Sequence, residues 1–193
     1  MTEVLLVRHA PTAWNEAGRL QGRADPPLSP QGRAVLAHWR LPQPFAAAPI
    51  LTSPLRRAQE TAAAFGAAEV EPRLIEMDWG AWEGRRLGEL RDADPDGMAA
   101  IEARGLDLRP PGGECPRDVM ARLDALFRDL APLPRVVLVA HKGTLRAAMA
   151  LAVGWAMTSK PPVRLGPDDA LAFALDAAGR PRPPLTPIRL VGD

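Results

Sequence analysis

Short apolar runs that alternate with helix signals constrain the fold of this chain more than any other feature. Residues 3–7 (EVLLV), 49–53 (PILTS) and 135–141 (RVVLVAH) are predicted strands, and the first and last are apolar enough to be fully buried. Helical patterns lie between them, so strand and helix alternate through most of the 193 residues. This alternation predicts an α/β fold with a mainly parallel sheet.

The helix and loop signals place the remaining elements. Two predicted helices open with a serine cap followed by proline: 29–39, capped by Ser29, and a second capped by Ser53 and closed by Gly66. Further helices are expected at 87–104 (interrupted by Pro95), 116–130 and 143–154, and strands at 170–176 and 187–191. Loops are expected at 8–28 and 109–116, and irregular structure with short extended pieces at 67–86, whereas 177–186 is rich in proline and glycine but too near the end to begin a second domain. No repeat or long linker divides the chain, so we expect one domain over 1–193.

Composition excludes several classes of protein. The net charge is +1, from 24 basic and 23 acidic residues, without the basic excess of a typical nucleic-acid binder. Cys115 is the single cysteine, so no internal disulfide can form, which fits a reducing compartment. The N-terminal residues do not resemble a signal peptide, and no apolar stretch is long enough to span a membrane. We therefore expect a cytoplasmic protein without nucleic-acid or membrane partners; the oligomeric state is left open.

Charged side chains follow three of the predicted strands. His9 and His141 end two of them, and Arg56 and Arg57 begin the helix after a third. Because ligands of open α/β sheets bind beyond the carboxyl ends of the strands, we expect two imidazoles and at least two guanidiniums around one crevice. A single histidine at a strand end is more often structural than catalytic, but two in one sheet favour a site.

These residue types suit phosphoryl chemistry. Arginine matches phosphate oxygens in charge and in fork geometry, and a neutral imidazole can attack phosphorus to form a phosphohistidine. The leaving oxygen then needs a proton donor, for which Glu76 and Glu83 in LIEMDWGAWEG are candidates. The sequence has no glycine-rich phosphate loop and no clustered metal ligands, so the simplest route uses neither metal nor cofactor.

Six ordered blocks resemble the histidine phosphatase superfamily, the phosphoglycerate-mutase-like proteins. They are RHAPTAWN (8–15), QGRADPPLSPQGRAVL (21–36), TSPLRRAQETA (52–62), LIEMDWGAWEG (74–84), PPGGEC (110–115) and VVLVAHKGTLRA (136–147). The resemblance covers residues 3 to 154 and implies a three-layer α/β/α fold with a mainly parallel central sheet.

The resemblance also implies roles for single residues. His9 is expected to be the nucleophile, Arg8, Arg57 and His141 to line the phosphate pocket, and Glu76 to act as general acid and then base, which leaves Glu83 structural. Further phosphate or substrate contacts are expected from Asn15, Gln21, Gly22 and Lys142. Among the departures from the family pattern, Ala10 and Lys142 stand where glycine is usual, and Cys115 replaces the usual serine; Ala10 is expected to alter the pocket only slightly.

The expected function is a metal-independent phosphomonoesterase that acts through a phosphohistidine on a small phosphorylated metabolite. A phosphoglycerate mutase is an alternative, although such mutases resemble longer chains with extra segments after the glutamate block. A protein-histidine phosphatase is another, although those proteins are shorter and lack that block. A non-catalytic phospho-ligand-binding module is the third. The chain resembles α-ribazole phosphatases and broad-specificity phosphatases, and sugar-phosphate and phosphoglycerate phosphatases are left open as well. Segment 85–117, with its six arginines, is expected to form the wall or lid of the pocket.

Overall fold

A mixed six-stranded sheet forms the centre of the protein. The computed structural model describes residues 1–191, and within them the strands lie in the order β3-β2-β4-β1-β5-β6. Their bounds are β1 Thr2–Arg8, β2 Ile50–Thr52, β3 Ala68–Val70, β4 Arg135–Ala140, β5 Asp169–Leu175 and β6 Pro181–Arg189. Strands β3, β2, β4 and β1 are parallel to one another, while β5 is antiparallel to both β1 and β6. The predicted mainly parallel sheet is confirmed, with an antiparallel edge.

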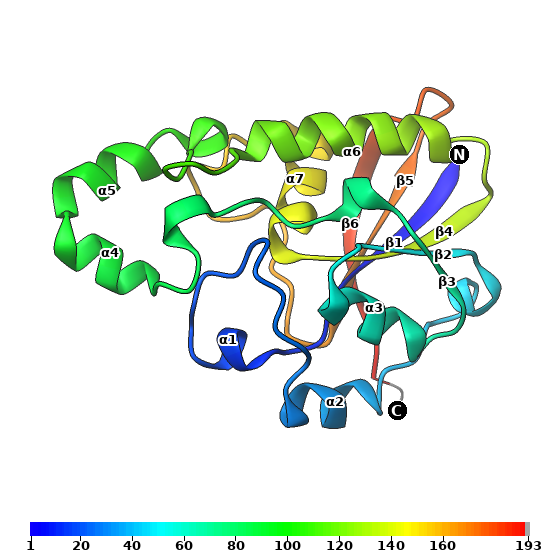
Figure 1. Ribbon diagram of the computed structural model, residues 1–193. Coiled ribbons are helices and arrows are strands. Elements are labelled where there is room, and N and C mark those ends of the chain that lie inside the picture. The colour runs from blue at the N-terminus through cyan, green and yellow to red at the C-terminus, as the bar shows by residue number, and fades with distance from the viewer. Residues whose placement is uncertain (192–193) are drawn as a thin grey trace.

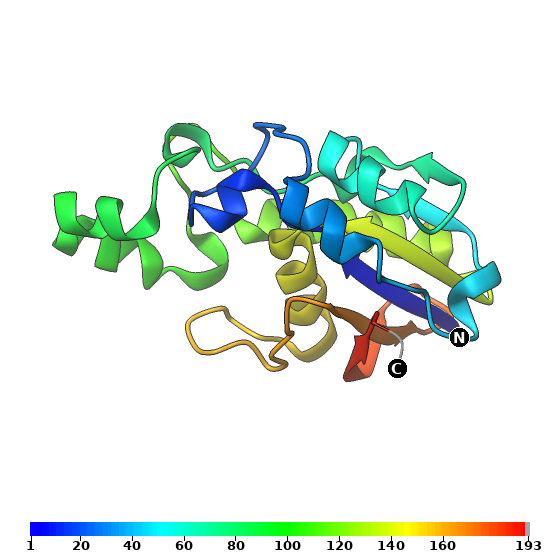
Figure 2. The ribbon, with the colours of Figure 1, turned by 90° about the horizontal axis from the view of Figure 1, so that it is seen from below.

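Helices cover both faces of the sheet (Figures 1 and 2). The helices are α1 Ala13–Glu16, α2 Pro30–Leu36, α3 Arg56–Ala63, α4 Leu87–Ala93, α5 Pro95–Glu102, α6 Pro116–Leu130 and α7 Lys142–Val153, with 3-10 turns at Phe45–Ala47, Pro72–Leu74, Gly80–Trp82 and Gly105–Asp107. Leu6 and Leu138 face α6 and α7, whereas Leu5 and Val137 face α2 and α3. Successive strand residues therefore enter opposite cores, which confirms the three-layer fold and explains why these strands are apolar without alternation.

Three sequence predictions were wrong in detail. The expected loop 8–28 contains the short helix α1, which Thr12 caps through its side chain. The second serine-proline signal does not cap a helix: α3 begins at Arg56, and Leu55 occupies the cap position. The strand expected at 187–191 begins earlier and covers Pro181–Arg189, because an edge strand tolerates the prolines that precede residue 187. By contrast, Ser29 caps α2 as predicted, accepting a hydrogen bond from the backbone of Gly32.

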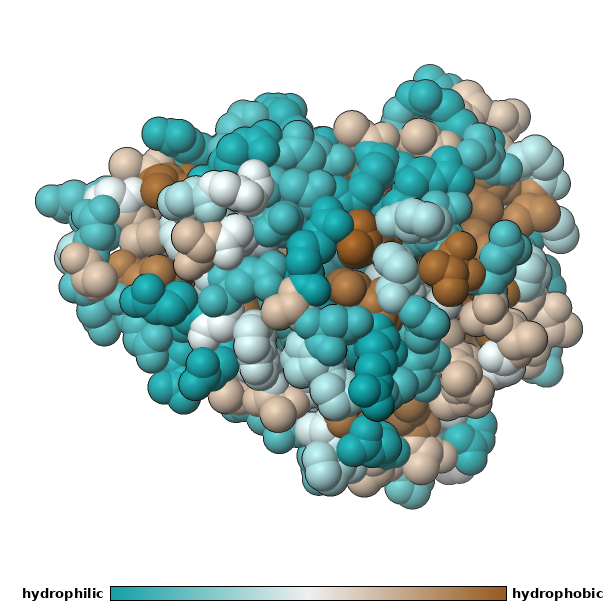
Figure 3. Space-filling model, viewed as in Figure 1, coloured by the Kyte–Doolittle hydropathy of each residue, from teal (hydrophilic) through white to brown (hydrophobic). Residues whose placement is uncertain are grey.

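Helices α4 and α5 project from one end of the sheet and enclose a small separate core (Figures 1 and 2). Trp82, Leu90 and Met98 form this core. Hydrophilic residues cover most of the face in Figure 3, and hydrophobic residues show there as small separate spots. None of the helices in residues 1–191 is both long and apolar enough to cross a membrane.

Candidate active site

The two catalytic candidates among the histidines follow neighbouring strands. Strands β1 and β4 pair in parallel, with Arg8 opposite Ala140, so His9 and His141 both leave the sheet at the same edge. Their ring centroids are 5.2 Å apart, and the backbone N–H of His9 donates to the carbonyl of Ala140 at 2.9 Å. The sheet topology therefore brings the two imidazoles together as predicted.

His9 is held as a neutral imidazole with one nitrogen free. Its Nδ1 lies 2.8 Å from the carbonyl oxygen of Ala10, which can only accept, so Nδ1 carries the proton and Nε2 keeps its lone pair. Burial lowers the pKa of His9 well below its ordinary value, and the charges of Arg8 and Arg57 lower it further. The pocket thus presents an unprotonated imidazole nitrogen next to two guanidiniums, which suits nucleophilic attack on an anion.

Arg57 lies beneath the pocket and is completely buried. Its guanidinium donates to the carbonyls of Gly22 at 2.8 Å and Ala24 at 2.9 Å, and it lies 3.4 Å from a carboxylate oxygen of Asp25. These contacts fix the planar fork in one orientation. The neighbouring Arg56 is exposed and pairs with Glu60 at 2.5 Å, so only one of the two tandem arginines reaches the site.

Ser53 contacts His141 rather than capping α3. Its hydroxyl lies 2.7 Å from His141 Nε2 and accepts a longer bond from the N–H of Leu55. Burial lowers the pKa of His141 well below its ordinary value, so the ring is neutral and one of its two nitrogens carries a proton. The buried Nδ1 has no partner among residues 1–191.

Glu76 is the buried carboxyl of the site. Its two oxygens accept from the backbone N–H groups of Met77 (2.8 Å) and Gly143 (3.1 Å), and burial raises its pKa above the ordinary value. A Cβ at position 143 would collide with this carboxyl, so the approach of α7 requires glycine. Glu83 instead binds the backbone N–H groups of Arg23 and Ala24, in agreement with its expected structural role.

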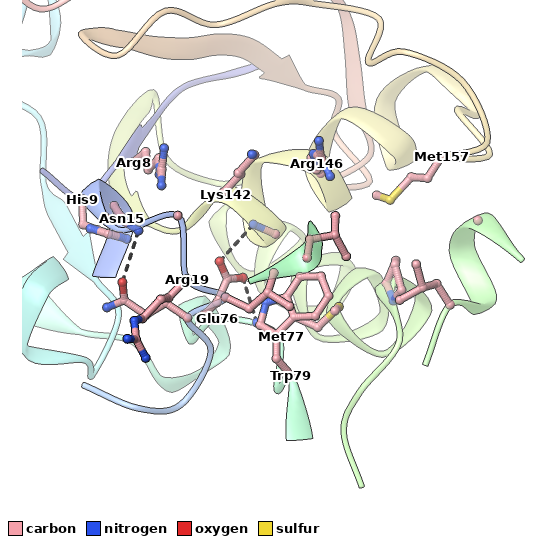
Figure 4. A pocket seen from close by; sticks show the side chains of 18 residues that line it. Arg8, His9, Asn15, Arg19, Glu76, Met77, Trp79, Lys142, Arg146 and Met157 are labelled. Carbon is pink, nitrogen blue, oxygen red and sulfur yellow. Dashed lines mark hydrogen bonds between the residues drawn. The ribbon is translucent and has the colours of Figure 1, made fainter. Parts of the chain in front are cut away.

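A cavity of about 550 Å³ opens at this edge of the sheet. Figure 4 shows Arg8, Lys142 and Arg146 along one side of it and Glu76 and Trp79 along the other. Of the predicted contact residues, Arg8, His9, Asn15, Gln21, Glu76 and Lys142 line the cavity, whereas Arg57 and His141 lie behind its wall.

The remaining predicted contacts hold the wall in place. Gly22 does not line the cavity, because its carbonyl is engaged by Arg57 and its Cα packs against the loop that follows Glu76. The side-chain amide of Gln21 lies between Thr12, whose hydroxyl is 2.7 Å away, and Arg57, whose nitrogens are 3.2 Å away. Ala10 is buried in the core and is not part of the lining, so its methyl leaves the cavity unobstructed.

Two further basic residues line the cavity, and sequence reasoning missed both. Arg19 comes from the loop after α1, and Arg146 from the second turn of α7. The spacing of Lys142 and Arg146, four residues apart on a predicted helix, is the signal that would have placed the second of these. Segment 85–117 does contribute to the wall through Leu87, Gly105 and Leu108, but none of its six arginines lines the cavity. Within residues 1–191, no three histidine, cysteine or acidic side chains gather in a way that would hold a metal ion.

Comparisons with known proteins agree with this geometry. The sequence model of the histidine phosphatase superfamily (branch 1) matches residues 4–172. A probable phosphoglycerate mutase GpmB of Enterobacter sp. (strain 638) is 33% identical over 153 residues, which are 73% of this chain and 70% of that protein. A metal-independent phosphoserine phosphatase of Arabidopsis thaliana is 33% identical over 159 residues, 76% of this chain and 67% of that protein.

A solved structure shares the whole fold. The native mycobacterial glucosyl-3-phosphoglycerate phosphatase aligns with a TM-score of 0.78 at 25% identity, and the alignment covers 100% of both chains. A family match over most of the chain and relatives at 33% identity lead to one conclusion. The chain belongs to the histidine phosphatase superfamily, branch 1, and is an enzyme of the phosphatase class.

Proposed function

We propose that this protein is a metal-independent phosphomonoesterase that hydrolyses a small phosphorylated metabolite through a phosphohistidine at His9. The observation that carries the proposal is the hydrogen bond of 2.8 Å from His9 Nδ1 to the carbonyl of Ala10. It leaves Nε2 unprotonated in a buried pocket where Arg8 and Arg57 supply the charge that attracts a phosphate. Nucleophile and anion site therefore coincide.

In the first step, His9 Nε2 attacks phosphorus and the bond to the leaving oxygen breaks. Arg8 and Arg57 balance the charge of the equatorial oxygens. When Ser53 donates to Nε2 of His141, the unpartnered Nδ1 of that ring carries the proton and donates to one of these oxygens. Glu76 gives its proton to the leaving oxygen, so the alcohol part of the substrate leaves in neutral form while the phosphoryl group stays on His9. Burial prepares Glu76 for this role because it raises the pKa of the carboxyl.

In the second step, water takes the place of the alcohol. The Glu76 carboxylate, now ionised, accepts a proton from that water while the oxygen bonds to phosphorus and the nitrogen–phosphorus bond breaks. Inorganic phosphate leaves, His9 returns to the neutral imidazole, and Glu76 is protonated again. Every proton and electron pair in the cycle is accounted for by His9, Glu76, water and substrate, and no step requires a metal.

A phosphoglycerate mutase is the second candidate, and the relative named as a probable mutase is the observation that favours it. The two reactions share the first step and differ in the acceptor. A mutase returns the phosphoryl group to a bound hydroxyl, whereas a phosphatase passes it to water. A non-catalytic module that only binds phosphorylated ligands would form no phosphoenzyme at all.

The test measures phosphate release from a panel of phosphomonoesters in EDTA, by wild type and His9→Ala side by side. The panel contains α-ribazole phosphate, phosphoserine, phosphoglycerate and several sugar phosphates. We expect release by the wild type only, together with an acid-labile phosphoenzyme that is absent from His9→Ala. Isomerisation of phosphoglycerate without phosphate release would favour the mutase. Equal rates for the two proteins, or loss of activity in EDTA, would refute the proposed mechanism.

A further inference from the structure

A smaller cavity adjoins the main one on the side of α7. Its volume is about 160 Å³, and it shares Arg8, Lys142 and Arg146 with the main cavity before it continues to Arg164 and Asp169. The three shared residues lie in a row in Figure 4, with Arg8 nearest His9 and Arg146 farthest from it. The basic wall of the pocket therefore extends well beyond the position of the transferred phosphoryl group.

The cations of this wall lie near the buried Glu76 but form no ion pair with it. Within the described part of the chain, no carboxylate lies within ion-pair distance of Arg8, Lys142 or Arg146, whereas arginines elsewhere on the surface are commonly paired, for example Arg91 with Glu102 at 2.6 Å. The one acid in the smaller cavity, Asp169, accepts from the backbone N–H of Gly166.

The placement of two of these cations is itself unfavourable. Lys142 and Arg146 are four residues apart on α7, so they lie on the same face of the helix, where like charges destabilise it. Burial lowers the pKa of Lys142 below its ordinary value, and the charges of Arg146 and Arg8 lower it further, while the charge of Glu76 acts in the opposite direction. An anion between them would relieve this repulsion.

The transferred phosphoryl group does not use all of this charge. Arg8 and Arg57 are the guanidiniums whose charges act on His9, and the proposed mechanism assigns them and His141 to the transferred phosphoryl group. Lys142 and Arg146 remain. We propose that these two residues form a second anion subsite, so that the preferred substrate is a small phosphate monoester with a further anionic group, a carboxylate or a second phosphate. This inference rests on the proposed phosphatase function, and it assigns to Lys142 a role in substrate selection.

The test compares three small substrates that differ in the second group: ethyl phosphate, phosphoglycolate and ethylene glycol bisphosphate. Their kcat/KM values are measured with wild type, Lys142→Gln and Arg146→Gln, and with Arg104→Gln as a control that removes an exposed charge outside both cavities. For each subsite variant we expect the preference for an anionic substrate over ethyl phosphate to fall about tenfold, the usual effect of losing one hydrogen bond between charged groups. The control should keep the wild-type preference.

A second readout separates this inference from the proposed function. The same three compounds are titrated calorimetrically into His9→Ala, alone and combined with Lys142→Gln. Tighter binding of the two anionic compounds, lost in the double variant, supports the subsite even if turnover fails and the proposed function is wrong. Preference for phosphoglycolate identifies the second group as a carboxylate, and preference for the bisphosphate identifies it as a phosphate. Equal binding of all three compounds, or a preference that survives both substitutions, would overturn the inference.

Discussion

The substitution Glu76→Gln tests the general acid with the smallest change of shape. Both carboxyl oxygens accept backbone hydrogen bonds, from Met77 at 2.8 Å and Gly143 at 3.1 Å. A glutamine can accept only one of them, and its NH₂ group faces the other N–H. One buried donor then lacks a partner, which costs about 1–3 kcal/mol of unfolding free energy and lowers Tm by about 2–4 °C per kcal/mol. The variant should therefore fold.

The effect on catalysis depends on the leaving group. With an alkyl phosphate, the leaving oxygen needs the proton of Glu76, and we expect kcat to fall by about 10²–10⁴-fold. With p-nitrophenyl phosphate the leaving group departs without a proton, so His9 is still phosphorylated at a near-normal rate. Water attack on the phosphohistidine then lacks its base and becomes slow.

The assay is stopped-flow absorbance of nitrophenolate with enzyme concentrations high enough to see one turnover. Glu76→Gln should release a burst of one nitrophenolate per active site, followed by a slow steady rate, and His9→Ala should release none. Thermal melts by circular dichroism confirm that both variants are folded. Wild-type turnover of an alkyl phosphate by Glu76→Gln would refute the assignment, as would an equal loss on both substrates without a burst.

Three further predictions follow from the same structure. Gly22→Ala places a methyl 2.6 Å from a backbone carbonyl of the adjoining loop, so urea melts should show that the unfolding free energy falls by about 1–3 kcal/mol. The control Gly88→Ala places its methyl where no atom lies within 4 Å and should not destabilise the protein. Equal stability of the two variants would contradict this packing argument. Ser53→Ala removes the hydroxyl that fixes His141, so kcat/KM should fall about tenfold, and full activity would show that the ring is positioned without it. His9 and His141 resist protonation in the folded protein but bind protons near pH 6.5 when unfolded, so the unfolding free energy should decrease as pH falls through that value. His9→Asn should reduce the slope of unfolding free energy against pH. An unchanged slope would contradict the lowered pKa of His9.

Much of the site follows from local sequence. Residues that directly continue a strand leave the sheet at a known edge, so the positions of His9 and His141 could be predicted from two apolar runs and the parallel topology. The choice between the tandem residues Arg56 and Arg57 could not be made from helix position alone. It depends on which of them finds the carbonyls of a loop more than thirty residues earlier in the chain.

Contacts between distant segments explain the errors as well. Ser53 carries a strong cap signal followed by proline, yet its hydroxyl contacts His141, 88 residues away. The prolines of 181–187 argue against a strand, but β6 lies at the edge of the sheet, where residues without an N–H are tolerated. Local propensity is a weak prior in both cases, and tertiary context overrides it.

The sequence by itself determined the class of fold, the buried strands and the residues that carry the chemistry, because each depends on apolar patterns and short motifs whose residues are neighbours in the chain. Only the tertiary structure decided the tautomer of His9, the partner of Ser53 and the row formed by Arg8, Lys142 and Arg146. These features depend on side chains from separate elements meeting in a buried space of low polarity, where burial, and not residue type, decides which groups are charged and which hydrogen bonds are made.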